Sequence, residues 1–89
     1  MAVRSGQLTV GTAATEIPAT CVMPFRLEIK NLDQTDDVYV GNGDVSTTTG
    51  MRLAKEERLE FFLAPLDTVS VVATKAGHQI AYILFTQAC

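Results

Sequence analysis

Apolar and polar residues alternate along much of this chain. Between residues 25 and 30, Phe25, Leu27 and Ile29 alternate with three charged side chains, so one face is apolar and the other is charged. A period of two is typical of a β-strand with one buried face. The same period recurs in residues 7–10, 38–40, 59–63 and 69–74. The pattern therefore predicts a series of short strands.

Turn-forming residues separate these runs. Glycine, proline, asparagine or aspartate occurs at residues 11–12, 18, 24, 33–37, 41–43, 50, 65–67 and 75–77. Short strands at such regular spacing predict an all-β fold, either a compact antiparallel β-sandwich or a small barrel of about seven to eight short strands. No linker, repeat or low-complexity tract divides the chain, so we expect residues 1–89 to form a single β domain.

Residues 51–63 are the part of the chain that competes for helix. They contain good helix formers, but Lys55 to Arg58 places four charges in a row, which interrupts the apolar stripe that a helix needs. From Leu59 onward the period returns to two. We therefore interpret residues 53–58 as a polar turn that leads into a strand, with a single helical turn as the alternative.

The last predicted strand differs from the others because residues 80–85 are apolar on both faces. Strands that are covered on both sides lose the alternation of half-buried strands. One interpretation is a central strand whose back is covered by a loop or by the N-terminal segment. The other interpretation is contact with a second chain. Two more strands favour it, because each carries an apolar residue, Phe62 or Val72, on an otherwise polar face. The predicted oligomer or partner interface comprises Phe62, Val72, Tyr82, Ile83 and Phe85.

The charge of the chain argues against some classes of partner. The formal net charge is −3, whereas proteins that bind nucleic acid usually present a basic surface. The longest uninterrupted apolar run, Ile80 to Phe85, is far shorter than the ~20 residues of a membrane-spanning helix. We therefore expect neither nucleic acid nor a membrane as a partner.

The N-terminal residues contain no continuous apolar segment of the kind found in secretory signals. We therefore expect synthesis in a cytoplasm and a soluble product. In that compartment the two cysteines, Cys21 and Cys89, are expected to stay reduced. A disulfide between them is the alternative if the protein ends up outside a cell.

The stretch VYVGNGDVSTTTG, residues 38–50, has the composition of a ligand-binding loop. A phosphate-binding loop needs its glycines to be followed by a lysine or by a helix. Here residues 41–43 are followed by Asp44, an anion, and then by a run of hydroxyl side chains. We instead interpret the stretch as a structural turn, in which Gly41 and Gly43 allow φ > 0, Asn42 and Asp44 close local turns, and Val45 anchors the loop to the core.

Calcium is a second candidate ligand for this region. An EF-hand counted from Asp33 would have Val38 where glycine is required and Asp44 where glutamate is required, so the motif fails at both diagnostic positions. An irregular site built from Asp36, Asp37 or Asp44 is the remaining form of this hypothesis. The competing interpretation, which we favour, is a solvated turn before a strand.

Catalytic chemistry has little support in this sequence. A nucleophile needs a base within reach, and nothing in the sequence links Cys21 with His78, the single histidine, which we expect in a solvated turn. A zinc site needs three or four ligands at recognisable spacing, and Cys21, His78 and Cys89 are scattered. Glu56, Glu57 and Glu60 are typical of a wet surface. We predict no catalytic residue, no metal ion and no cofactor, hence a non-enzymatic protein.

The elements described above resemble small structural proteins of bacteriophage virions. The pattern runs through Val38 to Gly41, an apolar residue at Val45, Gly50, Leu53, two acidic residues at Glu56 and Glu57, and "LDTVSVVA", residues 66–73. The N-terminal "GQLTVGTAATEIP" is similar to the opening strand pair of such proteins. The resemblance covers residues 7–85.

This resemblance implies a function in building a virion. It implies a capsid decoration, or minor capsid, protein that is made in the host cytoplasm, lies on the capsid surface and binds and stabilises the assembled head. The implied partners are the major capsid protein or other virion proteins, and the chain is expected to be a homo-oligomer. A tail, baseplate or fibre module, with receptor binding as one role, is the alternative.

Overall fold

The computed structural model describes residues 2–32 and 36–87 and confirms the all-β fold. In chain order the strands are β1 (Ala2–Val10), β2 (Thr15–Glu16), β3 (Phe25–Asn31), β4 (Val38–Gly41), β5 (Met51–Leu53), β6 (Arg58–Leu63), β7 (Ser70–Ala73) and β8 (His78–Thr86). All strand pairs are antiparallel.

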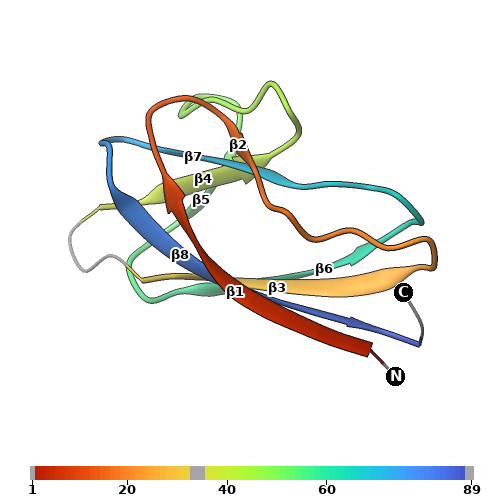
Figure 1. The fold of residues 1–89 in the computed structure, drawn as a ribbon. Coiled ribbons are helices and arrows are strands. Elements are labelled where there is room, and N and C mark those ends of the chain that lie inside the picture. Colours follow the sequence, from red (N-terminus) through yellow and green to blue (C-terminus); the bar gives the residue numbers. More distant parts are fainter. Residues whose placement is uncertain (1, 33–35, 88–89) are drawn as a thin grey trace.

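The strands form two four-stranded sheets that pack as a sandwich. Sheet A has the order β1-β8-β3-β6 and sheet B the order β2-β7-β4-β5. Figure 1 shows the two layers, with sheet B above and sheet A below. The sheets do not close into a barrel, so the sandwich form of the predicted fold is the correct one. We call the face of each sheet toward the other its inner face, and the opposite face its outer face.

The predicted alternation places the core between the sheets. In β3 the apolar residues are buried, and Leu27 lies opposite Phe61 of β6 and Leu84 of β8. The buried cluster draws on both sheets and on the loop before β3; it comprises Val10, Ile17, Ala19, Cys21, Phe25, Leu27, Ile29, Val38, Val40, Leu53, Val69, Val71, Ala73, Ile80 and Leu84. Removal of this surface from water is the main force that holds the two layers together.

The charged segment after β5 is a turn, as predicted, but it spans only residues 54–57, because Leu53 is buried in β5 and Arg58 is the first residue of β6. Ala54 N–H donates to the carboxylate of Glu57 (2.6 Å), and Glu57 N–H donates back to the Ala54 carbonyl (3.1 Å). Between them Glu56 adopts a φ of 58°, in the left-handed region. The turn therefore leads from β5 directly into β6, and its charges lie outside the core.

The loop between β4 and β5 is anchored by Val45. This side chain is buried. A Cβ atom added at Gly41 would lie 2.9 Å from the Val45 Cγ2 atom, and one added at Gly50 would lie 2.7 Å from it. Asn42 Oδ1 accepts the Asp44 N–H (3.1 Å), which is the predicted local turn. The predicted positive φ at Gly41 and Gly43 is wrong, because among the glycines only Gly77 shows one in the described residues. At Gly41 it is the close approach of Val45 that favours glycine.

Replacing Gly50 by alanine is expected to destabilise the fold by about 1–3 kcal/mol, because the new Cβ would overlap Val45 and would lie 2.8 Å from the Cβ of Tyr39. The same substitution at Gly43 is the matched control, since no described residue other than its two chain neighbours lies within 4 Å of a Cβ there. Thermal unfolding of both variants should show a clear loss for Gly50→Ala alone. Equal midpoints would contradict the role given to Val45.

Candidate functional site

A row of large side chains crosses the outer face of sheet A. The strand register places Val3 opposite Phe85, Phe85 opposite Arg26, and Arg26 opposite Phe62. Ile83 lies on the same face, two residues before Phe85 on β8. We call these five residues the aromatic patch.

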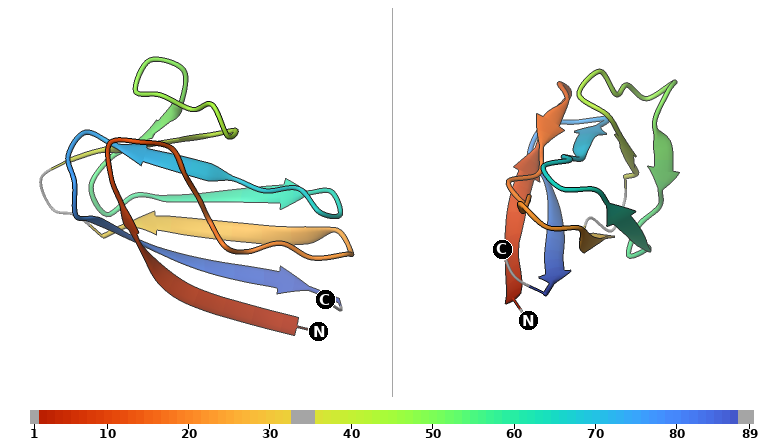
Figure 2. Two further views of the ribbon diagram at one scale, coloured as in Figure 1. Left: turned by 45° about the horizontal axis from the view of Figure 1, so that its top comes forward. Right: turned by 90° about the vertical axis from the view of Figure 1, so that its right-hand side faces the viewer.

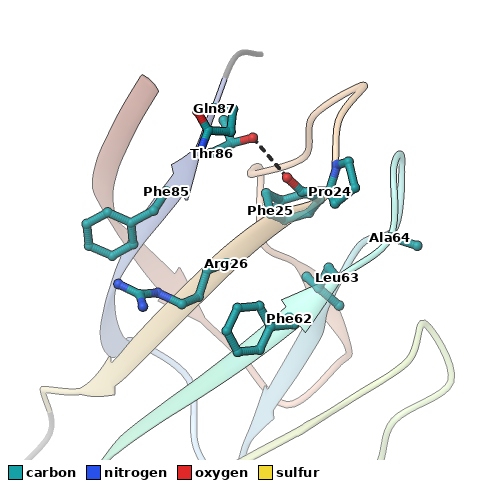
Figure 3. A pocket seen from close by; sticks show the side chains of 9 residues that line it. All are labelled: Pro24, Phe25, Arg26, Phe62, Leu63, Ala64, Phe85, Thr86 and Gln87. Atoms are coloured by element: carbon teal, nitrogen blue, oxygen red, sulfur yellow. Dashed lines mark hydrogen bonds between the residues drawn. The ribbon is translucent and has the colours of Figure 1, made fainter. Parts of the chain in front are cut away.

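Arg26 lies at the centre of the aromatic patch. Its guanidinium carbon is 4.7 Å from the centroid of the Phe85 ring, which is a favourable cation–π distance. Its Nε atom is buried and has no hydrogen-bond partner among the described residues; the Glu60 Oε2 atom, at 3.7 Å, is too far for a hydrogen bond. Arg26 thus partly covers Phe85, whereas Phe62 on the edge strand is 82% exposed. Figure 3 shows Arg26 between the two rings.

The aromatic patch adjoins a shallow hollow at one end of the sandwich. The hollow has a volume of about 610 Å³, and Pro24 and Ala64 form its far rim (Figure 3). Thr86 Oγ1 donates to the Pro24 carbonyl (2.9 Å) and fixes that rim. The two loops that carry the rim also bear the exposed side chains of Val22, Met23 and Leu66. The apolar surface therefore continues from the sheet onto its loops.

The charges beside the aromatic patch neutralise one another. Glu28 pairs with Arg58 (3.4 Å) across β3 and β6, in addition to the Arg26–Glu60 pair. These ion pairs are largely solvent-exposed, so each contributes little to stability. The aromatic patch itself therefore offers mainly apolar contacts and one guanidinium.

The structure brings together three of the five predicted interface residues, Phe62, Ile83 and Phe85. Val72 is only 3% exposed and belongs to β7 of the other sheet, a central strand that is buried on both faces. Tyr82 points to the inner face and packs against the core. Val72 and Tyr82 therefore do not share a surface with the other three residues.

Sequence reasoning missed two members of the aromatic patch, Val3 and Arg26. Only the second half of β1 alternates clearly, because polar Arg4, Ser5 and Gly6 break the pattern. The N-terminal segment was one candidate to cover the back of β8; instead it pairs beside β8 as the next strand. In the sequence, Arg26 is indistinguishable from an ordinary solvent-exposed charged residue. Its position between two phenylalanines depends on the strand register, which the sequence alone does not show.

Two of the three described carboxylates of the calcium hypothesis, Asp36 and Asp37, are engaged in ion pairs. Asp36 pairs with Lys75 (2.8 Å) and Asp37 with Arg52 (2.9 Å). Asp33 lies outside the described residues. Among residues 2–32 and 36–87, no three His, Cys, Asp or Glu side chains gather as a metal site would require.

His78 is not the solvated turn residue that the sequence suggested. It is the first residue of β8, is fully buried, and its Nε2 lies 2.7 Å from Oδ1 of Asn31. The side-chain Nδ2 of Asn31 donates one hydrogen bond to the Asp36 carbonyl and one to the Leu53 carbonyl, each with a donor–acceptor distance of 3.0 Å. Its Oδ1 is therefore an acceptor, and His78 Nε2 must donate. The pair ties both sheets to the loop before β4.

Cys21 is not the free thiol that we expected. It is buried and disulfide-bonded, and the second cysteine, Cys89, lies outside the described residues. The expectation depended on a cytoplasmic compartment, which no residue of the sequence reports directly. A disulfide-bonded sulfur is not a nucleophile, so the Cys–His hypothesis has no support in this structure.

Comparisons with known proteins were made by sequence and by structure. No family model, no curated protein and no solved structure matches the chain. In the described part of the chain, no helix is long and apolar enough to cross a membrane.

Proposed function

We propose that this protein is a non-enzymatic structural module that docks on a larger assembly through the aromatic patch. The observation that carries the proposal is the exposure of Phe62. Burial of a phenylalanine is worth roughly 1.5–3 kcal/mol, which Phe62 forgoes in the isolated chain. Aromatic side chains and arginine are enriched at protein interfaces, where they often dominate the binding energy.

The assembly that we propose is a bacteriophage capsid, on which the protein acts as a decoration, or minor capsid, protein bound to the major capsid protein. The proposal is supported by the sequence pattern of residues 38–73, described above. A net charge of −3 suits a module outside the shell, which needs no affinity for the packaged DNA. The disulfide at Cys21 suits a protein that works outside a reducing cytoplasm.

The mechanism is stabilisation by binding. A protein that binds the assembled shell but not its separated subunits shifts the equilibrium toward the shell by mass action. Because a lattice repeats each site many times, even a modest contact at each site adds up to a large stabilisation. A rigid two-layer sandwich suits this role, since it loses little conformational freedom on docking.

The second candidate function is a tail, baseplate or fibre module. The same aromatic patch would serve to dock the domain beside its neighbours in the tail. Receptor or glycan binding is less favoured, because such sites depend on exposed aromatic rings and the chain has two tyrosines and no tryptophan. Fractionation of intact particles separates these functions: we expect the protein with heads, and recovery with tails would favour the alternative.

Purified protein is expected to bind empty shells that lack it, to saturate at a fixed number of copies per shell, and to raise the temperature at which shells rupture. Cosedimentation gives the stoichiometry and differential scanning calorimetry gives the rupture temperature. Heat-unfolded protein is the control for nonspecific adsorption. Shells that neither retain the folded protein nor gain stability would overturn the proposed function.

A further inference from the structure

The four edge strands of the sandwich differ in length and in charge. β2 has two residues and β5 has three, so neither offers a long row of backbone groups. β6 has six residues, but charged Arg58 and Glu60 lie on it. β1 has nine residues, pairs without interruption along β8, and has a single charge, Arg4, and no proline. Long edge strands usually carry charged residues or proline that hinder pairing, because an open edge is a template for another strand.

The backbone groups that face this open edge can be identified from the ladder. The Leu32 N–H donates to the Gln79 carbonyl (3.1 Å), so Gln79 directs its backbone groups toward β3. In an antiparallel ladder the direction alternates, so Ile80 and every second residue after it bond to β1. Their partners in β1 are the even-numbered residues. The outward N–H and C=O groups are therefore those of Val3, Ser5, Gln7 and Thr9, and no described strand pairs with them.

We propose that β1 pairs with β1 of a second copy of this chain, antiparallel, about a twofold axis at Gly6. This register sets Val3 against Thr9 of the second copy, and Ser5 against Gln7 of the second copy. All four outward residues of each copy are then paired. The four residue pairs make roughly eight inter-chain hydrogen bonds, two for each pair. The two sheets A become one continuous sheet, because β1 is the outermost strand of its sheet (Figure 2).

The sequence of β1 suits pairing with itself in this register. Arg4 faces Leu8 of the second copy, so the only charges on the two strands do not meet. At the axis Gly6 meets Gly6 in a non-hydrogen-bonded pair, where Cα atoms approach to about 4.5 Å. The inner side of Gly6 is already filled, since a Cβ there would lie 2.7 Å from the Tyr82 Oη. A shifted register would leave at least one of the outward residues unpaired.

This pairing uses a surface distinct from the exposed ring of Phe62, so it stands whether or not the proposed function is correct. Its consequence would be an assembly with two aromatic patches on one extended outer face. Two linked patches on a repeating lattice bind more tightly than either does alone, without any additional contact. A twofold dimer with self-complementary contacts is also the commonest form of homo-oligomer.

Charge substitutions on β1 test both the partner and the register. Ser5 and Gln7 are exposed, so Ser5→Lys with Gln7→Lys should leave the monomer folded while it sets lysine against lysine twice across the axis. We expect the dimer dissociation constant to rise about tenfold or more. Ser5→Lys with Gln7→Glu instead sets lysine against glutamate, and the dimer should persist. Thr12→Lys with Thr47→Lys, two exposed loop positions, is the control for added charge.

Sedimentation velocity over ~1–200 µM protein would measure these constants, with circular dichroism to confirm the fold of each variant. Amide exchange provides an independent reading: Ser5 and Gln7 should be protected only in the dimer, and Leu8 in both states. A wild-type monomer throughout this range would overturn the proposal. A dimer that the double lysine variant leaves unchanged would also overturn it.

Discussion

Replacing Asn31 by alanine is expected to lower the free energy of unfolding by about 2–4 kcal/mol. The substitution removes two donors from the carbonyls of Asp36 and Leu53 and removes the acceptor of His78 Nε2. A buried polar group left without its partner costs about 1–3 kcal/mol. In a domain of this size we expect the thermal midpoint to fall by roughly 15 °C, measured by circular dichroism.

Asn42→Ala is the matched control for this substitution. Asn42 is exposed and its side chain makes one local contact, to the Asp44 N–H, so a loss below about 1 kcal/mol is expected. A double-mutant cycle with His78→Ala isolates the contact between the two buried side chains, and its coupling should reach about 1–3 kcal/mol. Independent effects of Asn31 and His78 would contradict the structural role given to this pair.

Replacing Phe62 by aspartate is expected to weaken binding to the proposed partner assembly at least about 30-fold, which corresponds to the loss of one interface hot spot. The fold should survive, because the ring is largely exposed and lies on an edge strand. An aspartate would also stand beside Glu60 and compete with it for Arg26. Quantitative cosedimentation with shells, at matched protein concentrations, measures the effect.

Met51→Asp controls for the added charge and for the loss of an exposed apolar side chain. Met51 is 60% exposed and lies on β5 of sheet B, away from the aromatic patch. We expect this variant to bind as the wild-type protein does. If Phe62→Asp lowers the unfolding midpoint by more than a few degrees, Phe62 belongs to the core instead. If Met51→Asp weakens binding as much as Phe62→Asp does, the aromatic patch is not the docking site.

The strands with a clear period of two were predictable from sequence. The alternation in β3 and β6 identified their buried faces, and four consecutive charges identified the turn before β6. The first half of β1 and the short β2 were not predictable, because their residues form strands only through pairing with β8 and β7. Such pairing is set by the tertiary context and not by local preference.

The candidate site was predictable only in part. Phe62 and Val72 carry the same signal, an apolar residue on an otherwise polar face, but the structure exposes one and buries the other. Val72 lies on a central strand, with Tyr39 opposite it on β4, whereas Phe62 lies on an edge strand with a neighbour on one side only. The contact of Asn31 with His78 joins residues 47 positions apart, and no local pattern could indicate it.

The central claim is that the outer face of sheet A meets the partner assembly. The most direct measurement is a cryo-EM reconstruction of shells saturated with the protein, at a resolution that distinguishes the two sheets. We predict density in which Phe62, Arg26 and Phe85 lie against the shell, while the loop of residues 41–50 points elsewhere. A reconstruction in which Phe62 faces solvent and sheet B contacts the shell would contradict the claim.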